Sequence, residues 1–145
     1  VEIADVHFDI QVENFQRCLE MGIPIAVGSD LIGPPTHPLG EQAIELELMA
    51  RYGMNEMDVI RAATDIGSQV LGLQDSIGTI ETGKLADIVA VENDPLQDIT
   101  TFSKVQFVMK QGKVFRQSGF TRPEAWLGNP SPRVIDLASN GVTKD

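Results

Sequence analysis

Hydrophobic residues in the first half of the chain recur at the spacing of an α-helix, in segments separated by glycine. The single cysteine, Cys18, falls on the apolar stripe of the first of these segments. A buried free thiol is therefore expected, and a disulfide within the chain is excluded. The pattern predicts helices over residues 9–21, from about Glu41 to Arg51, and from a cap at Asn55 to a stop at Gly72.

A short apolar run from Ile23 to Gly28 lies between the first two predicted helices and ends at Asp30. Such a run is typical of a strand that is buried on both faces, as in a parallel sheet. The succession of helix, tight turn and buried strand favours an α/β fold and places Asp30 at the end of that strand. The following segment, residues 31–40, contains three prolines and is predicted to be a loop.

From Ser76 onward the pattern changes to short strands. Strands are predicted at Ile77–Glu81 and Leu85–Val91, and a hairpin is predicted around the turn Gln111-Gly112. The chain is predicted to divide into an α/β part at 1–75, a β part at 76–118 and an extended tail at 119–145. A lone strand has no sheet, and hairpins need a third partner, so neither part completes a fold.

Composition and charge exclude several classes of function. With 145 residues, 42% of them hydrophobic and 22% charged, the chain has the composition of a globular protein. A net charge of −10 disfavours nucleic acid and anionic membranes as partners, and no apolar run approaches the ~20 residues of a membrane span. The chain begins at Val1 without a leader, so we expect a processed or truncated chain whose targeting signal could be missing, and a cytoplasmic location.

Asp30 is the leading candidate for chemistry. A carboxylate at the end of a buried strand can ligate a divalent metal, take a proton from metal-bound water and deliver it to a leaving amine. It can equally cap the following loop through its own backbone. Spacing alone leaves both interpretations open.

The other polar residues carry weaker signals. His37, in the proline-rich loop, could contact a substrate, although the residues alone favour an exposed loop histidine, and His7 is expected to be inert. Asp87 interrupts an apolar strand, which is more typical of a structural hydrogen-bonding residue than of a catalyst. A metal site needs three or four ligands, and with two histidines and no His-x-His or cysteine pair we do not expect the chain to build an ordinary dinuclear site by itself. Three acidic residues are expected to form a solvated helix face: Glu41, Glu45 and Glu47.

Several runs in order resemble the metal-dependent amidohydrolase superfamily. The run Gly-Ile-Pro-Ile-Ala-Val-Gly-Ser-Asp at 22–30, His-Pro-Leu-Gly-Glu at 37–41 and Glu-Leu-Glu-Leu-Met at 45–49 are similar to its last barrel strand and helix. Members usually show Gly-Thr-Asp at the strand end, so Ser29 is a conservative departure. The segment 54–64, with Leu-Gly-Leu at 71–73, is similar to the helix that leads out of the barrel.

The resemblance continues into the second half and covers roughly residues 9–116. The segments 77–89, 94–96 and 108–113 are similar to the composite β-sandwich of that superfamily. The imidazolonepropionase-like and Xaa-Pro dipeptidase-like members are the most similar. The implied fold is α/β plus β: the last strand and helices of a TIM-type (β/α)8 barrel, followed by part of a composite β-sandwich, and therefore incomplete.

The resemblance also implies a chemistry. Asp30 would be a metal ligand and proton shuttle, and His37 a substrate-binding residue. The intact enzyme would hold one or two divalent metals, zinc above all, whereas this chain alone would bind none tightly. The superfamily's first-strand His-x-His, bridging carboxylated lysine and mid-barrel histidines have no counterparts here. We therefore expect the C-terminal piece of a hydrolase that cleaves C–N bonds through a metal-activated water and is inactive alone.

The expected partners follow from that chemistry. The substrate would be a small amide, peptide or cyclic amide. Uncovered apolar faces predict a homo-oligomer or association with the missing barrel portion. The alternative is a non-catalytic assembly or binding module derived from the same fold. A requirement for bound metal would favour the enzyme, and a stable complex without metal would favour the module.

Overall fold

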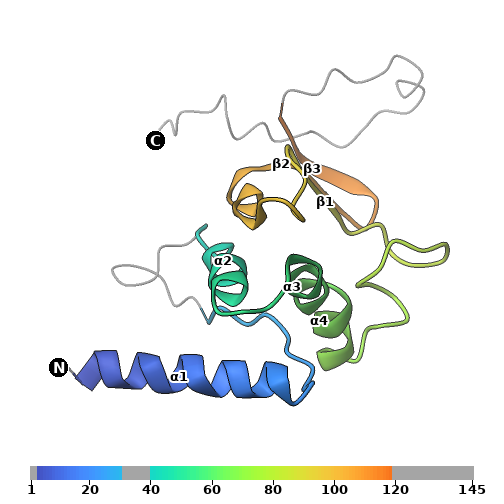
Figure 1. Ribbon diagram of the computed structural model, residues 1–145. Helices are drawn as coiled ribbons and strands as arrows, with labels where there is room; N and C mark the ends of the chain where they lie inside the picture. Colours follow the sequence, from blue (N-terminus) through green and yellow to red (C-terminus); the bar gives the residue numbers. More distant parts are fainter. Residues whose placement is uncertain (1–2, 31–39, 119–145) are drawn as a thin grey trace, which may run out of the picture.

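The computed structural model describes residues 3–30 and 40–118, with side chains from residue 8 onward. In this part of the chain the helices come first and an antiparallel sheet follows (Figure 1). Figure 1 shows the long helix α1 on one side, the shorter helices in the middle and the sheet on the other side. The elements are α1 (Ile3–Glu20), α2 (Ile44–Arg51), α3 (Glu56–Ala63), α4 (Asp65–Val70), β1 (Ile88–Val91), the 3-10 helix η1 (Ile99–Lys104), β2 (Val105–Lys110) and β3 (Lys113–Gln117).

The buried core lies where α2 and α3 meet η1. Val59 and Ala62 on α3 are fully buried, and Ile99 of η1 packs into the same cluster. The segment before Asp30 joins this cluster through Ile25 and Val27. The remaining buried members are Leu46, Met49 and Met54. Burial of these side chains is what fixes α2, α3 and η1 together.

Asn55 caps α3 as its position in the sequence predicts. Its backbone is extended, with φ −72° and ψ 154°, and its side-chain oxygen accepts the Asp58 backbone N–H at 3.0 Å. The predicted helix does not run on to Gly72 without a break, because Thr64 leaves the helical region at φ −126° and ψ −86°. The break resets the helical phase, and Val70 at the end of α4 is exposed.

The three described strands form one antiparallel sheet in the order β1-β2-β3. The β2–β3 hairpin turns at Gln111-Gly112, both with positive φ (50° and 74°), so the predicted hairpin is confirmed. The prediction of a strand at Ile77–Glu81 is wrong. That segment contacts α4 instead: Gly78 lies against Ser68 there, with φ +95°.

The apolar run Ile23 to Gly28 is not a strand in the described part of the chain. The Val27 amide bonds to the Ala62 carbonyl of α3 at 3.1 Å, and the Gly28 amide bonds to a side chain of α2. Strand structure depends on a hydrogen-bonded neighbouring strand, and the described residues offer none. The barrel arrangement and the domain limits at 75 and 118 therefore stay predictions, and the tail at 119–145 lies outside the described residues.

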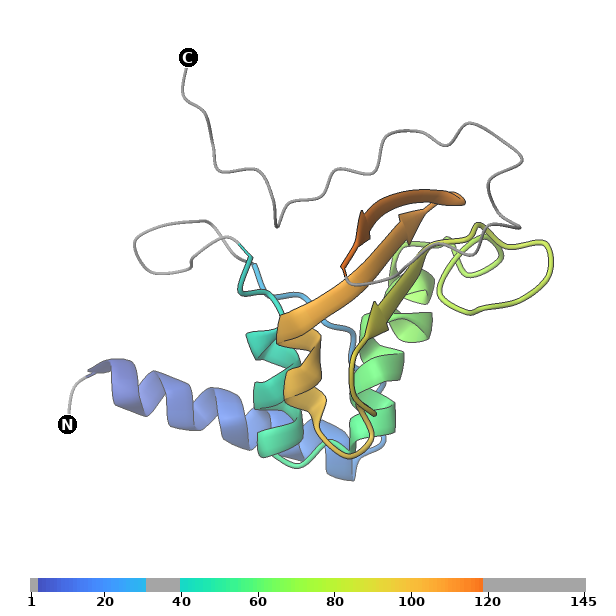
Figure 2. The same ribbon diagram turned by 90° about the horizontal axis from the view of Figure 1, so that it is seen from above.

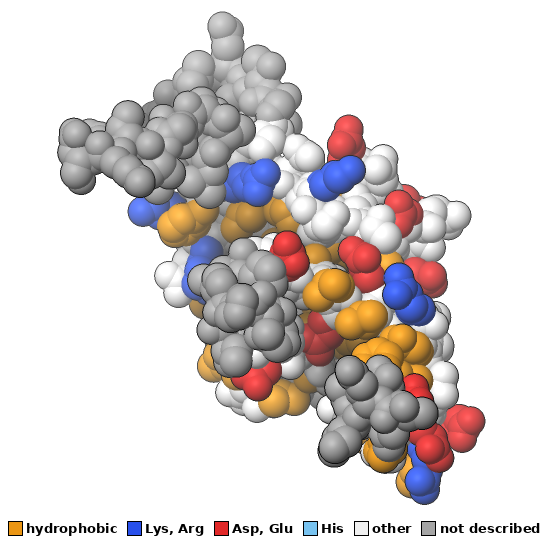
Figure 3. Space-filling view, turned by 90° about the vertical axis from the view of Figure 1, so that its left-hand side faces the viewer, with side chains coloured by type: hydrophobic (Ala, Val, Ile, Leu, Met, Phe, Trp, Pro, Cys, Tyr) orange, Lys and Arg blue, Asp and Glu red, His pale blue; other side chains and the backbone are white. Residues whose placement is uncertain are grey.

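The surface carries large apolar side chains. Val70, Leu71 and Ile80 are 73%, 67% and 84% exposed. Figure 3 shows hydrophobic side chains interspersed with acidic ones on one face of the molecule. In the described part of the chain, no helix combines the length and the apolar character needed to cross a bilayer.

Candidate functional site around Asp30

Asp30 ends the extended segment that runs beside α2 and α3. Its side chain is exposed, and its backbone has φ 46°, in the left-handed region that aspartate tolerates better than most residues. Among the described residues, no hydrogen bond or ion pair engages its carboxylate. The carboxylate is thus presented outward from a fixed backbone. Whether it caps the following loop concerns residues 31–39, which lie outside the described part.

Two helices hold the backbone that leads to Asp30. The Val27 N–H donates to the carbonyl of Ala62 on α3, and the Gly28 N–H donates to Oε1 of Glu45 on α2 at 3.1 Å. The side chains of Ile25 and Val27 in the same segment pack against the core. The segment is therefore anchored on both sides within three residues of Asp30.

The prediction of a solvated helix face at Glu41, Glu45 and Glu47 is only partly correct. Glu41 is exposed, as expected, but Glu45 and Glu47 are half-buried, and Oε2 of Glu45 is shielded from solvent with no hydrogen-bond partner among the described residues. Glu45 precedes the buried Met49 by four residues, so both lie on the same side of α2. That spacing was the signal in the sequence that could have distinguished Glu45 from its acidic neighbours.

The described residues supply one candidate metal ligand, Asp30. They contain no group of three or more histidine, cysteine, aspartate or glutamate side chains placed to hold a metal. A carboxylate is a suitable ligand for zinc, but a site needs three or four ligands. Asp30 fits as one member of such a set, and the described residues do not complete it. His37 and the side chain of His7 lie outside the described residues.

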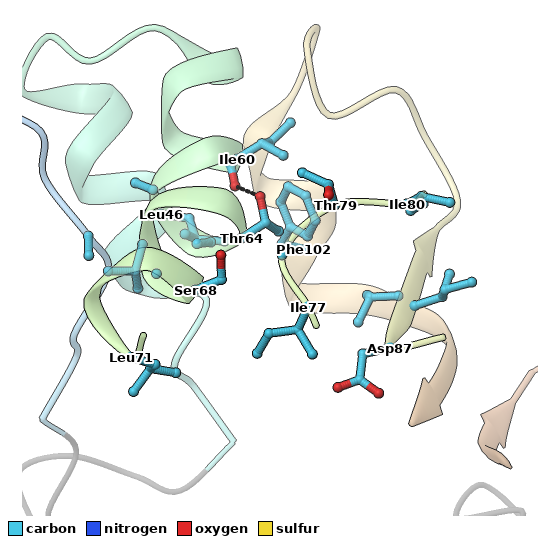
Figure 4. Close-up of a pocket in the computed structure, with 18 of the residues that line it drawn as sticks. Leu46, Ile60, Thr64, Ser68, Leu71, Ile77, Thr79, Ile80, Asp87 and Phe102 are labelled. Atoms are coloured by element: carbon cyan, nitrogen blue, oxygen red, sulfur yellow. Dashed lines mark hydrogen bonds between the residues drawn. The ribbon is translucent and has the colours of Figure 1, made fainter. Parts of the chain in front are cut away.

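A cavity of about 860 Å³ separates the helices from the sheet. Figure 4 shows Leu46, Ile60 and Leu71 on the helical side facing Ile77 and Phe102 across it. The hydroxyls at its edge already have partners, since Thr64 donates to the Ile60 carbonyl at 2.7 Å and Ser68 to the Asp65 carbonyl at 2.6 Å. The cavity is thus an apolar gap rather than a cluster of reactive groups.

Asp87 lies at the sheet side of this cavity and has a structural role, as its position in the strand indicates. Its Oδ1 accepts the Gln111 backbone N–H at 2.6 Å, and its Oδ2 bonds to Lys110 Nζ at 3.1 Å. These contacts tie the start of β1 to the β2–β3 turn, which lies beside it in Figure 2. The Gln111 amide first, and then Lys110, hold the pKa of Asp87 below its ordinary value of 3.8.

The lowered pKa of Asp87 makes the stability of the fold depend on pH. Because the folded pKa lies below the unfolded one, the charged carboxylate stabilises the fold above the unfolded pKa. This contribution is lost as the pH falls through the folded value, below about pH 4. Asp98, whose pKa the Thr100 hydroxyl and amide lower, acts in the same direction. In thermal melts followed by circular dichroism, we expect Asp87→Asn to have a lower melting temperature than the parent near neutral pH. Its melting temperature should also fall less than that of the parent on acidification.

A matched variant separates this effect from general charge. Glu92→Gln removes an exposed carboxylate next to β1 that makes no hydrogen bond to described residues, so it should keep the parental acid dependence. An acid dependence that is as steep in Asp87→Asn as in the parent would show that the turn contact contributes nothing.

Comparison with known proteins decides the family. A model of the amidohydrolase family matches residues 5–115. The chain belongs to the amidohydrolase family. The resemblance inferred from the runs around Asp30 and from the second half of the chain is thereby confirmed.

Individual amidohydrolases align over most of this chain. Ochratoxinase from Aspergillus niger is 34% identical over 122 residues, which are 81% of this chain and 24% of the relative. Imidazolonepropionase from Symbiobacterium thermophilum is 28% identical over 111 residues, 74% of this chain and 26% of the relative. A crystal structure of a Xaa-Pro dipeptidase with methionine bound in its active site superposes with a TM-score of 0.67 and 35% identity, covering 72% of this chain and 25% of that one. The chain thus spans about a quarter of the length of these amidohydrolases.

Proposed function

We propose that this chain is the C-terminal part of a metal-dependent amidohydrolase and carries one residue of its active site, Asp30. The observation that carries the proposal is the exposed Asp30 carboxylate, with φ 46°, at the end of a backbone that both α2 and α3 hold. Membership of the amidohydrolase family supports hydrolysis as the reaction. The quarter-length match to the relatives supports a larger active unit.

Asp30 would act as a metal ligand and as the proton carrier of hydrolysis. When bound, the divalent metal, for which zinc is our first choice, polarises the substrate carbonyl and activates a water molecule. The Asp30 carboxylate would accept a proton from the attacking water and release it to the departing nitrogen. An exposed carboxylate that no described residue engages is suited to this exchange. His37 is proposed to contact the substrate beside it.

The proposed position in the larger enzyme accounts for why residues 23–30 pair with no described strand. This segment would be the last strand of a (β/α)8 barrel, paired with strands supplied from outside the described residues. The sheet β1–β3 would be part of a β-sandwich whose other strands cover the apolar cavity. An isolated chain would then leave Leu71 and Ile80 uncovered and associate through them, either with copies of itself or with the barrel portion.

The substrate class is proposed from the chemistry and the relatives together. Ochratoxinase and imidazolonepropionase are among the relatives by sequence, and a Xaa-Pro dipeptidase is similar in structure and sequence. We propose a C–N bond in a small peptide, amide or cyclic amide as the bond that is cleaved. Xaa-Pro dipeptides are the first probe, because the named dipeptidase is also a structural match.

The experiment that tests the function is a hydrolysis assay on the natural polypeptide that contains this chain. Xaa-Pro dipeptides and imidazolone propionate are offered with added zinc, and each rate is compared with that of the Asp30→Asn variant. The exposed apolar residues Val70, Leu71 and Ile80 favour a second candidate, a non-catalytic assembly module. Zinc-dependent turnover that requires Asp30 supports the enzyme. A stable metal-free complex without turnover supports the module.

A further inference from the structure

The carboxylate of Glu45 makes a hydrogen bond that bridges two elements far apart in sequence. Its Oε1 accepts the Gly28 N–H at 3.1 Å across 17 residues of chain. Among the described residues, this is the side-chain hydrogen bond that holds the segment before Asp30, since the neighbouring Val27 amide bonds to a backbone carbonyl. The Glu45 bond and the Val27–Ala62 bond together constrain two successive amides of this backbone.

The burial of Glu45 indicates that the contact is specific. Its second oxygen, Oε2, is shielded from solvent and has no hydrogen-bond partner among the described residues, which costs free energy that a solvated glutamate would not lose. An ordinary surface position on α2 would avoid this cost. Glu47, two residues on, is also half-buried but makes no side-chain hydrogen bond among the described residues. The difference between the two glutamates thus lies in the bond to Gly28.

We propose that Glu45 is a positioning residue: its carboxylate fixes the backbone at Gly28 and thereby sets where the Asp30 carboxylate lies. Asp30 lies only two positions after Gly28, so a change at the Gly28 amide is transmitted to Asp30 through a short piece of backbone. The Val27–Ala62 bond limits movement of the preceding residue. Without Glu45 the Gly28 amide would lose this hydrogen bond to α2, and the apolar packing of Ile25 and Val27 and the Val27–Ala62 bond would remain. The inference rests on the proposed function of Asp30, although the backbone constraint can be measured by itself.

The test compares matched variants of two glutamates on the same helix in the 145-residue chain. Amide hydrogen exchange and the NMR signals of Gly28 and Asp30 are recorded for the parent, Glu45→Ala, Glu45→Gln and Glu47→Ala. The Val59 amide, within α3, reports global opening, so the Gly28 rate is expressed relative to it. We expect Glu45→Ala to raise this relative rate by about tenfold, since the Gly28 N–H loses its hydrogen-bond acceptor. Glu45→Gln retains an acceptor oxygen and should lie between Glu45→Ala and the parent.

The outcomes separate the positioning role from the function of Asp30. Displaced Asp30 signals in Glu45→Ala, with Glu47→Ala like the parent, support the positioning role. A relative Gly28 rate in Glu45→Ala within about twofold of the parent overturns it, as does an equal rise in Glu47→Ala. Loss of Gly28 protection in Glu45→Ala supports the constraint on the backbone. If Asp30→Asn then keeps full hydrolytic activity, the proposed function is overturned while that constraint still stands. Unchanged Gly28 protection in Glu45→Ala, together with loss of hydrolysis in Asp30→Asn, would overturn the positioning role and support the proposed function.

Discussion

Replacing Asp30 with asparagine is expected to lower the kcat/KM of the hydrolase that contains this chain by about 10²- to 10⁴-fold, the usual contribution of a general acid–base group. Asparagine has nearly the same shape but cannot carry a proton between water and the leaving nitrogen. It also accepts the left-handed φ of 46° about as well as aspartate does. Because the side chain is exposed, the free energy of unfolding should change by less than about 0.5 kcal/mol. A fall in activity would therefore reflect loss of the chemical role of the carboxylate and not unfolding of the chain.

The measurement is steady-state hydrolysis of a Xaa-Pro dipeptide with zinc present, alongside thermal melting of each variant. Asp75→Asn is the matched control, because Asp75 is an exposed aspartate without a described side-chain partner and follows α4, 45 positions after Asp30. It should retain the parental rate. If Asp30→Asn hydrolyses the substrate within about threefold of the parent, the carboxylate does not take part in the reaction.

Gly78→Ala is expected to have the largest effect on stability, lowering the free energy of unfolding by about 3 kcal/mol or more. Gly78 has φ +95°, a conformation that side chains disfavour. A Cβ atom there would also lie 2.6 Å from Ser68 Cβ and 3.1 Å from the Thr64 carbonyl oxygen. Ser68 is 2% exposed on the short helix α4, so it has little room to move. The substitution would thus push residues 77–80 away from α4.

Gly83→Ala separates the steric clash from the backbone strain. Gly83 has the same φ of +95°, but a Cβ there meets nothing within 4 Å, so that variant carries only the strain, about 1 kcal/mol. Urea unfolding of both variants and the parent gives the two free energies. Equal decreases in the free energy of unfolding would show that Ser68 moves aside at little cost and that the steric clash contributes nothing.

Features that depend on nearby residues could be predicted from the sequence. The Asn55 cap and the Gln111-Gly112 turn are set by hydrogen bonds and dihedral angles within a few residues, and both are confirmed. The Asp98 cap of η1 is equally local, since its side chain accepts the Thr100 N–H, but the 3-10 helix was not predicted. Short 3-10 helices lack the 3.6-residue repeat on which the prediction of helices depends.

Features that depend on distant residues could not be predicted. The apolar run at 23–28 has the composition of a strand, but strand structure requires a neighbouring strand that the described residues do not supply. Glu45 is one of three glutamates on a seven-residue stretch, and only its bond to Gly28 sets it apart. The position of Asp30 at the end of an apolar run could be inferred, whereas the means of holding it there came from the structure.

The most direct test of the central claim is the metal content of the purified 145-residue chain. The claim is that Asp30 is one ligand of a metal site whose other ligands lie outside this chain. Zinc, manganese and iron are measured by elemental analysis on the parent and on Asp30→Ala. The account predicts less than about 0.1 metal per chain in both, because one carboxylate does not replace three or four ligands. Near-stoichiometric metal in the parent that is lost in Asp30→Ala would contradict it, since this chain would then build a complete site by itself.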